Sequence, residues 1–261
     1  MRASYQLRNV LVREEGAGPL VVLVHGYPLD GDMWEDVSHR LAKRFRVLRP
    51  DLPSRRDTPH PMQATMAEYA RWIGAVIEAG GGKAAIAGFS MGGYVLLELL
   101  RQKPQAVVSA AFVDTQAGPD TPETREARNR SLQTAREMGP GAVSEAMIPR
   151  LLSKRGRSDP ALVGRVRAMV RRQNPNSLEN DLLAMRDRPD SFPSLPSIAV
   201  PVLVVVGSED EITPPEKSEA MTRAIPGARL ERIDGAGHLS PMERPDEVAA
   251  ALGAHLEKLP R

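Results

Sequence analysis

The chain has 261 residues, no cysteine, 35 lysines and arginines against 33 aspartates and glutamates, and 41% hydrophobic residues. This length can bury one large core, and the missing thiols exclude a cysteine nucleophile, disulfides, cysteine-ligated zinc and iron–sulfur clusters. The formal net charge of +2 and the 4% aromatic content argue against a nucleic-acid partner. The histidines, at 25, 39, 60, 238 and 255, lack metal-ligand spacing, so we expect no metal and no cofactor.

The N-terminal residues lack the apolar stretch of a signal peptide. The longest apolar runs, such as Leu20–Val24 and Val202–Val206, are far shorter than the roughly 20 residues that a membrane span needs. We therefore expect a cytoplasmic protein with no membrane partner.

Short β-branched runs alternate with helical patterns along most of the chain, which predicts a mostly parallel sheet covered by helices, the α/β class. The predicted strands are, in chain order, Tyr5–Val12, Leu20–His25, Arg46–Asp51, Ala84–Phe89, Val107–Asp114, Val202–Gly207 and Arg229–Asp234. The predicted helices lie near 33–44, 65–79, 91–102, 216–225 and 245–258.

Residues 118–195 interrupt this alternation, because they contain no convincing strand. Their helical patterns cover Glu123–Glu137, Ala142–Leu152 and Ala161–Gln173. They hold 14 lysines and arginines against 10 aspartates and glutamates, so this segment carries +4 and the remainder −2. We interpret 118–195 as a helical cap inserted into a core domain formed by 1–117 and 196–261. A solvated helical face also explains the charge excess.

The sequence Gly88-Phe89-Ser90-Met91-Gly92 is a G-x-S-x-G pattern with a predicted strand before it and a helix after it. As a bare string the pattern is weak, but strand–turn–helix is the setting of a nucleophile elbow. Glycines on both sides of the serine permit a turn that lifts its hydroxyl above the sheet. We predict Ser90 as the nucleophile. The alternative is a glycine-rich turn that only connects the two elements.

A serine nucleophile needs a base, and we predict His238. It lies in the glycine-rich loop Asp234–Pro241, directly after a predicted strand, which gives it freedom to reach the serine. His39, His60 and His255 are interpreted as surface histidines, the last of them on an amphipathic terminal helix.

The base needs a carboxylate to orient it, and Asp210 follows the predicted strand Val202–Gly207. The order Ser90, Asp210, His238 is the serine–acid–histidine order of α/β hydrolases. Glu209 and Glu211 are neighbouring alternatives, and Asp114 ends an earlier predicted strand.

Two N–H groups are also needed to hold a developing oxyanion. Met91, directly after the nucleophile, supplies one, and Tyr27 in the loop His25-Gly26-Tyr27-Pro28 is the natural second donor. We interpret His25 as a structural residue of that loop rather than as the base.

These segments together resemble the α/β-hydrolase superfamily, and within it the small capped esterases, enol-lactone hydrolases and cofactor-free haloperoxidases. The segments that carry the resemblance are His25–Pro28, Asp51–Pro53, Gly88–Gly92, Gly207–Pro215 and Gly235–Pro241. The resemblance implies an eight-stranded, mostly parallel sheet and a pocket between sheet and cap. It also supports Ser90, Asp210 and His238 as a triad, with Tyr27 and Met91 as oxyanion donors. In that family a segment like Glu243-Arg244-Pro245 frequently accompanies the histidine loop, and the resemblance implies a structural role for it.

One departure from the family pattern follows Asp51-Leu52-Pro53, where glycines usually continue the loop. This sequence has Arg55 and Arg56 at that point. They either belong to a solvated loop or recognise an anionic part of the substrate.

The sequence thus predicts a carboxylic ester hydrolase that forms an acyl-enzyme on Ser90 and acts on a small-molecule ester, an anionic one being an option. The same triad fits an enol-lactone or carbon–carbon bond hydrolase, or a perhydrolase or haloperoxidase. The non-enzymatic alternative is a small-molecule receptor with a vestigial triad. The sequence does not predict the oligomeric state.

Overall fold

The computed structural model describes residues 2–7, 10–53 and 65–257. In this part of the chain eight strands form one sheet in the order β1-β2-β4-β3-β5-β6-β7-β8. The strands are β1 (Arg2–Leu7), β2 (Val10–Glu15), β3 (Leu20–Val24), β4 (Arg46–Pro50), β5 (Ala84–Phe89), β6 (Val107–Val113), β7 (Val202–Gly207) and β8 (Arg229–Ile233). β2 pairs antiparallel with β1 and β4, and the remaining pairs are parallel. The predicted α/β-hydrolase fold is confirmed.

The central strands are buried because their sequences are apolar on both faces. Every residue of β5 and β7 is buried, and so is all of β3 after Leu20. Strands of this kind need helices on both sides of the sheet. Parallel pairing also gathers their carboxyl ends along one edge, where the loops that follow β5, β7 and β8 meet.

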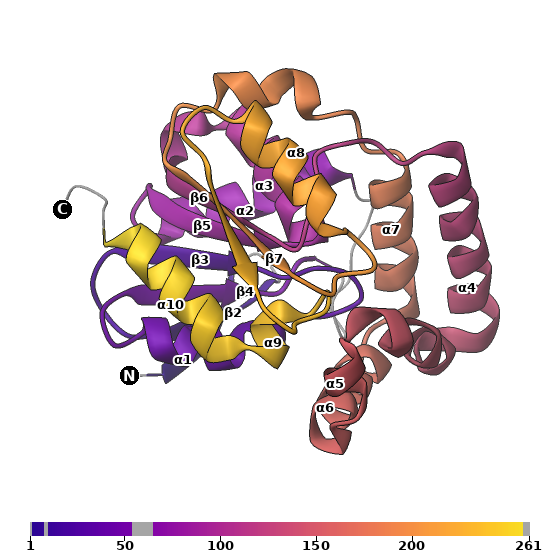
Figure 1. Ribbon diagram of the computed structural model, residues 1–261. Helices are drawn as coiled ribbons and strands as arrows, with labels where there is room; N and C mark the ends of the chain where they lie inside the picture. Colours follow the sequence, from indigo (N-terminus) through magenta and orange to yellow (C-terminus); the bar gives the residue numbers. More distant parts are fainter. Residues whose placement is uncertain (1, 8–9, 54–64, 258–261) are drawn as a thin grey trace.

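The helices lie on both faces of the sheet, with α1 and α10 on one face and α2, α3 and α8 on the other (Figure 1). They are α1 (Glu35–Leu41), α2 (Met66–Gly80), α3 (Met91–Gln102), α4 (Pro122–Leu151), α5 (Lys154–Arg157), α6 (Pro160–Arg171), α7 (Pro175–Arg186), α8 (Pro215–Ala224), α9 (Ser240–Glu243) and α10 (Pro245–Leu256). The described residues also contain the 3-10 turns η1 (Gly31–Trp34), η2 (Pro104–Ala106) and η3 (Phe192–Ser197).

The chain between β6 and β7 is helical, as its sequence predicts, and α4 to α7 gather to one side of the sheet (Figure 1). Helix α4 contains a break at Gly139, whose φ of 73° is open to glycine but strained for other residues. This break separates the two predicted helices Glu123–Glu137 and Ala142–Leu152. The sequence patterns did not identify α7, which begins at a proline behind the capping residue Asn174.

Two predictions are wrong. The predicted strand Tyr5–Val12 is two strands, because Leu7 of β1 is the antiparallel partner of Val10 of β2. The polar pair Arg8-Asn9 interrupts that apolar run in the sequence. His255 is not a surface residue: it is 4% exposed, and Ser109 and Arg229 contact its two ring nitrogens at 2.6 and 3.3 Å.

Within the ranges that the structure describes, no helix is both long enough and apolar enough to cross a bilayer.

Candidate active site

Ser90 lies in a sharp turn between β5 and α3. Its backbone has φ 49° and ψ −112°, a conformation that is rare for a residue with a side chain. A Cβ atom on Gly88 would lie less than 3.0 Å from the carbonyl oxygen of Gly92, so only glycine fits there. The turn is held by the bond from Ser90 N–H to the Val113 carbonyl, 2.9 Å, and by the Thr115 hydroxyl, which donates to the Ser90 carbonyl at 2.7 Å. The G-x-S-x-G pattern therefore forms the strained elbow that its setting predicts.

His238 lies between Ser90 and Asp210. Its Nε2 is 2.9 Å from Ser90 Oγ, and its Nδ1 is 2.8 Å from Asp210 Oδ2. Ser90 is 8% exposed and His238 is 1% exposed, so this chain of contacts is shielded from bulk water. The Phe89 ring packs against the imidazole with 5.0 Å between centroids. The structure thus brings together the three residues that the sequence singles out.

The Asp210 carboxylate accepts four hydrogen bonds. Its Oδ1 accepts from the backbone N–H groups of Ile212 and Thr213, at 2.8 and 2.9 Å. Its Oδ2 accepts from the Thr213 hydroxyl and faces His238 Nδ1, both at 2.8 Å. Burial raises the pKa of Asp210, but the charge of His238 and these hydrogen bonds outweigh it, so the pKa lies below its ordinary value. Asp210 is therefore ionised at neutral pH, and its Oδ2 can hold a proton on the Nδ1 side of the imidazole.

The three other candidate carboxylates have different partners. Glu209 accepts from the backbone N–H of Lys154, and Glu211 lies 3.8 Å from Arg157. Asp114 is fully buried beneath the site, where its Oδ1 accepts from Gly207 N–H at 2.8 Å and its Oδ2 from the Ser240 hydroxyl. Burial, followed by the charge of Asp210, raises the pKa of Asp114 well above its ordinary value.

The loop that contains Tyr27 packs directly on the elbow. A Cβ atom on Gly26 would lie less than 3.0 Å from the Phe89 ring, and one on Gly92 would lie equally close to the backbone of Val24 and His25. The backbone amides of Tyr27 and Met91 therefore belong to segments in close contact.

His25 joins the two loops after β3 and β4. The Leu52 N–H donates to His25 Nε2 at 2.8 Å, which leaves Nδ1 as the donor to the Gly26 carbonyl at 3.0 Å. Both ring nitrogens are thus engaged with the backbone, in agreement with a structural role.

Glu243 has a larger role than the sequence indicates. Its carboxylate accepts from the N–H of Gly237, at 2.9 Å, and from the N–H and hydroxyl of Ser153, so it ties the histidine loop to the end of α4. Burial raises its pKa. Thr213 was also missed. An aspartate in a loop can signal a turn in which its side chain accepts from the following backbone N–H groups, but no local pattern indicates that the Thr213 hydroxyl contacts the carboxylate.

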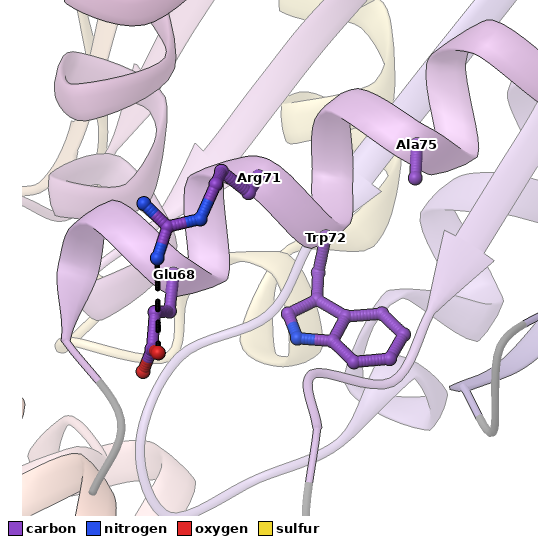
Figure 2. A pocket seen from close by; sticks show the side chains of 4 residues that line it. All are labelled: Glu68, Arg71, Trp72 and Ala75. Atoms are coloured by element: carbon purple, nitrogen blue, oxygen red, sulfur yellow. Dashed lines mark ion pairs between the residues drawn. The ribbon is translucent and has the colours of Figure 1, made fainter. Parts of the chain in front are cut away.

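Other predicted features lie apart from this site. Arg55, Arg56 and His60 lie outside the described residues. A hollow of about 240 Å³ along α2 is lined by Glu68, Arg71, Trp72 and Ala75, none of which comes from a site loop (Figure 2). Among the residues that the structure describes, no group of three or more histidine, aspartate or glutamate side chains could hold a metal ion.

Comparisons with known proteins identify the family of the chain. A model of the alpha/beta hydrolase family matches residues 21–251. A pimeloyl-[acyl-carrier protein] methyl ester esterase of Neisseria meningitidis is 30% identical over 237 residues, which cover 88% of this chain and 90% of that protein. A thermophilic esterase of Thermogutta terrifontis, solved with malate bound, is 36% identical with a TM-score of 0.91, covering 99% of this chain and 98% of its own. The enol-lactonase of Burkholderia xenovorans shares the fold, with a TM-score of 0.89 at 24% identity over 98% of this chain and all of its own.

Proposed function

The chain belongs to the alpha/beta hydrolase family and is an esterase, and we propose that it cleaves carboxylic esters through an acyl-enzyme on Ser90. The observation that carries this proposal is the position of His238, within hydrogen-bond distance of both Ser90 Oγ and Asp210 Oδ2. A serine hydroxyl is a poor nucleophile until a base removes its proton, and this arrangement supplies that base.

In the proposed reaction, Ser90 Oγ attacks the ester carbonyl carbon while its proton passes to His238 Nε2. Asp210 accepts a hydrogen bond from the Nδ1–H and stabilises the imidazolium that forms. The N–H groups of Tyr27 and Met91 hold the oxyanion. His238 then protonates the leaving alkoxide, and the tetrahedral intermediate collapses to the acyl-enzyme and the alcohol. Water attacks the acyl-enzyme with the same base, which releases the carboxylic acid and restores Ser90.

We further propose that residues 118–195 form a cap over this site, on a core made of 1–117 and 196–261. Ser90 and His238 are almost fully covered, so a substrate reaches them only when covering residues move. The backbone at Leu152 and Ser153, where α4 ends, would lie less than 3.0 Å from a Cβ atom on Gly237, next to the base. Because of this close packing, movement of the end of α4 should displace the histidine loop.

An acyl chain on an acidic carrier is the substrate class that we favour within ester hydrolysis. Most cap arginines form ion pairs, such as Arg136 with Glu179 and Arg167 with Glu145. Within the described part of the chain, Arg150, Lys154 and Arg155 are exposed and make no ion pair, and they flank the contact with the histidine loop. The Neisseria relative's name includes a carrier-linked methyl ester. Hydrolysis of a methyl acyl ester, free and carrier-bound, measures this preference.

The decisive test replaces Ser90 with alanine and measures hydrolysis of p-nitrophenyl acetate and butyrate. We expect kcat to fall by about 10⁴-fold or more, because the nucleophile of a triad acts as a unit with its base. A fluorophosphonate probe should label the parent once and leave Ser90→Ala unlabelled. Ser158→Ala, an exposed hydroxyl at the end of α5, is the matched control and should behave like the parent. If Ser90→Ala keeps parental activity, the proposal is wrong.

A further inference from the structure

One buried charged group at which the cap contacts the core is Asp30, three residues after Tyr27. The guanidinium of Arg172, at the end of α6, forms a fork on this carboxylate, with its Nε 2.8 Å from Oδ2 and a terminal nitrogen 2.7 Å from Oδ1. The amide of Gln173 donates to Oδ2 at 2.9 Å. Cap side chains therefore donate three hydrogen bonds to a single core carboxylate.

This carboxylate depends on its cap partners. The Asp30 side chain is fully buried, and burial alone raises its pKa. The hydrogen bonds and charge of Arg172 outweigh that effect, so the pKa of Asp30 lies well below its ordinary value. A partnered buried carboxylate becomes costly when its partner leaves. If α6 separates from the core, the ionised Asp30 loses its partner, and its buried position becomes energetically unfavourable.

The segment that Asp30 belongs to is the loop between β3 and η1, which contains Tyr27. Its other side is fixed to the sheet, because Gly31 N–H donates to Asp51 Oδ1 at 2.9 Å. Within it, Leu29 N–H donates to the Gly26 carbonyl at 3.0 Å. The loop is short and stiff, so a displacement of Asp30 is transmitted toward the Tyr27 amide. An oxyanion donor must be placed within a few tenths of an ångström to be effective.

We propose that Arg172 is a positioning residue of the esterase site: through Asp30 it sets the loop of Tyr27, so the oxyanion hole is complete only when the cap is seated. The inference rests on the proposed function, because it takes Tyr27 as an oxyanion donor. Arg172 does not act on the substrate. Its effect belongs to the transition state, where the oxyanion exists, and should therefore appear in kcat rather than KM.

Neighbouring arginines provide a contrast. Arg171 pairs with Glu145, on α4 of the same cap, at 3.4 Å. Arg165 pairs with Asp36, which is 36% exposed, so that pair lies in solvent and is weak. Arg172, together with Gln173, instead hydrogen-bonds to the buried Asp30.

The experiment compares Arg172→Met with the matched control Arg171→Met on p-nitrophenyl butyrate. Exhaustive fluorophosphonate labelling counts folded sites, so kcat is expressed per labelled serine. We expect Arg172→Met to lower kcat about 10- to 100-fold, up to the loss seen when one oxyanion donor is removed, with KM changed less than about threefold. Arg171→Met should keep the parental kcat. Asp30→Asn, which removes the charge that the fork grips, should resemble Arg172→Met.

A purely structural role predicts a lower thermal midpoint for Arg172→Met with an unchanged kcat per labelled serine, and that result overturns the proposal. Should Arg172→Met fail to fold, Arg172→Lys decides, since lysine keeps the charge but cannot form the fork. It should lose kcat by a smaller factor, and a parental kcat in it refutes the inference. If the proposed function itself is wrong, the Ser90→Ala variant will keep its esterase activity, and this result is distinct from those for Arg172.

Discussion

Replacing Asp210 with asparagine should move the proton of His238 to the nitrogen that faces Ser90. In the parent, Oδ1 accepts from the N–H groups of Ile212 and Thr213. The asparagine oxygen must take this position, because an NH₂ group there would meet two other donors. Its NH₂ group then occupies the Oδ2 position and donates to His238 Nδ1. The neutral imidazole must carry its proton on Nε2, and it can no longer accept one from Ser90.

The expected loss follows from that inversion. Asparagine in the equivalent position of a serine protease triad lowers kcat about 10⁴-fold, equivalent to about 5.5 kcal/mol of activation free energy. The two backbone N–H groups of Ile212 and Thr213 that donate to Oδ1 fix the asparagine oxygen at that position, which leaves its NH₂ group facing His238. We therefore expect the full loss here.

Steady-state hydrolysis of p-nitrophenyl butyrate at pH 7 measures this loss, and circular dichroism checks that the variant is folded. Asp210→Ala is the informative control, because it removes the orienting carboxylate without placing a donor against Nδ1. It should retain more activity than Asp210→Asn. A folded Asp210→Asn with more than a tenth of the parental kcat refutes the reasoning and reopens the assignment of the acid.

Two further predictions concern stability. The folded-state pKa of Asp114 is raised, so its ionisation destabilises the protein as pH rises above about 4, its unfolded value. Asp114→Asn removes this ionisation. The thermal midpoint of the variant, measured relative to that of the parent, should therefore rise from pH 5 to pH 8. A difference between the two midpoints that does not change with pH contradicts the prediction. Gly92→Ala places a methyl group against the carbonyls of Val24 and His25, and should cost about 1–3 kcal/mol in unfolding by denaturant. Gly164→Ala, in open space on α6, should be neutral or stabilising, and equal losses at both glycines would contradict the steric argument.

The sequence predicts the sheet well where burial on both faces leaves a continuous apolar run. The predicted strands Ala84–Phe89 and Val202–Gly207 match β5 and β7 to the residue. The elbow and the order of its partners are also readable, because glycine spacing and strand ends are local features. The prediction of Tyr5–Val12 as one strand was wrong because only the two polar residues Arg8 and Asn9 separate the segments that form β1 and β2.

Contacts between distant residues could not be predicted. His255 is buried because Ser109, 146 positions away, contacts its imidazole, and no local pattern contains that partner. Arg172 and Asp30 are 142 positions apart, and each is an ordinary surface residue when read alone. The +4 charge of residues 118–195 likewise gives no indication of the ion pairs that these residues form. Such features depend on which surfaces meet, and composition and periodicity do not record that.

The distance along the chain between Ser90 and its proposed base has a consequence for synthesis. The contact with His238 joins residues 148 positions apart. At about 5–20 residues per second, the ribosome adds His238 about 7–30 s after Ser90. Throughout that interval the proposed triad is incomplete, so we expect the nascent chain not to hydrolyse esters. Ester turnover in a translation reaction should therefore begin only after the histidine loop has been translated and has folded onto the elbow.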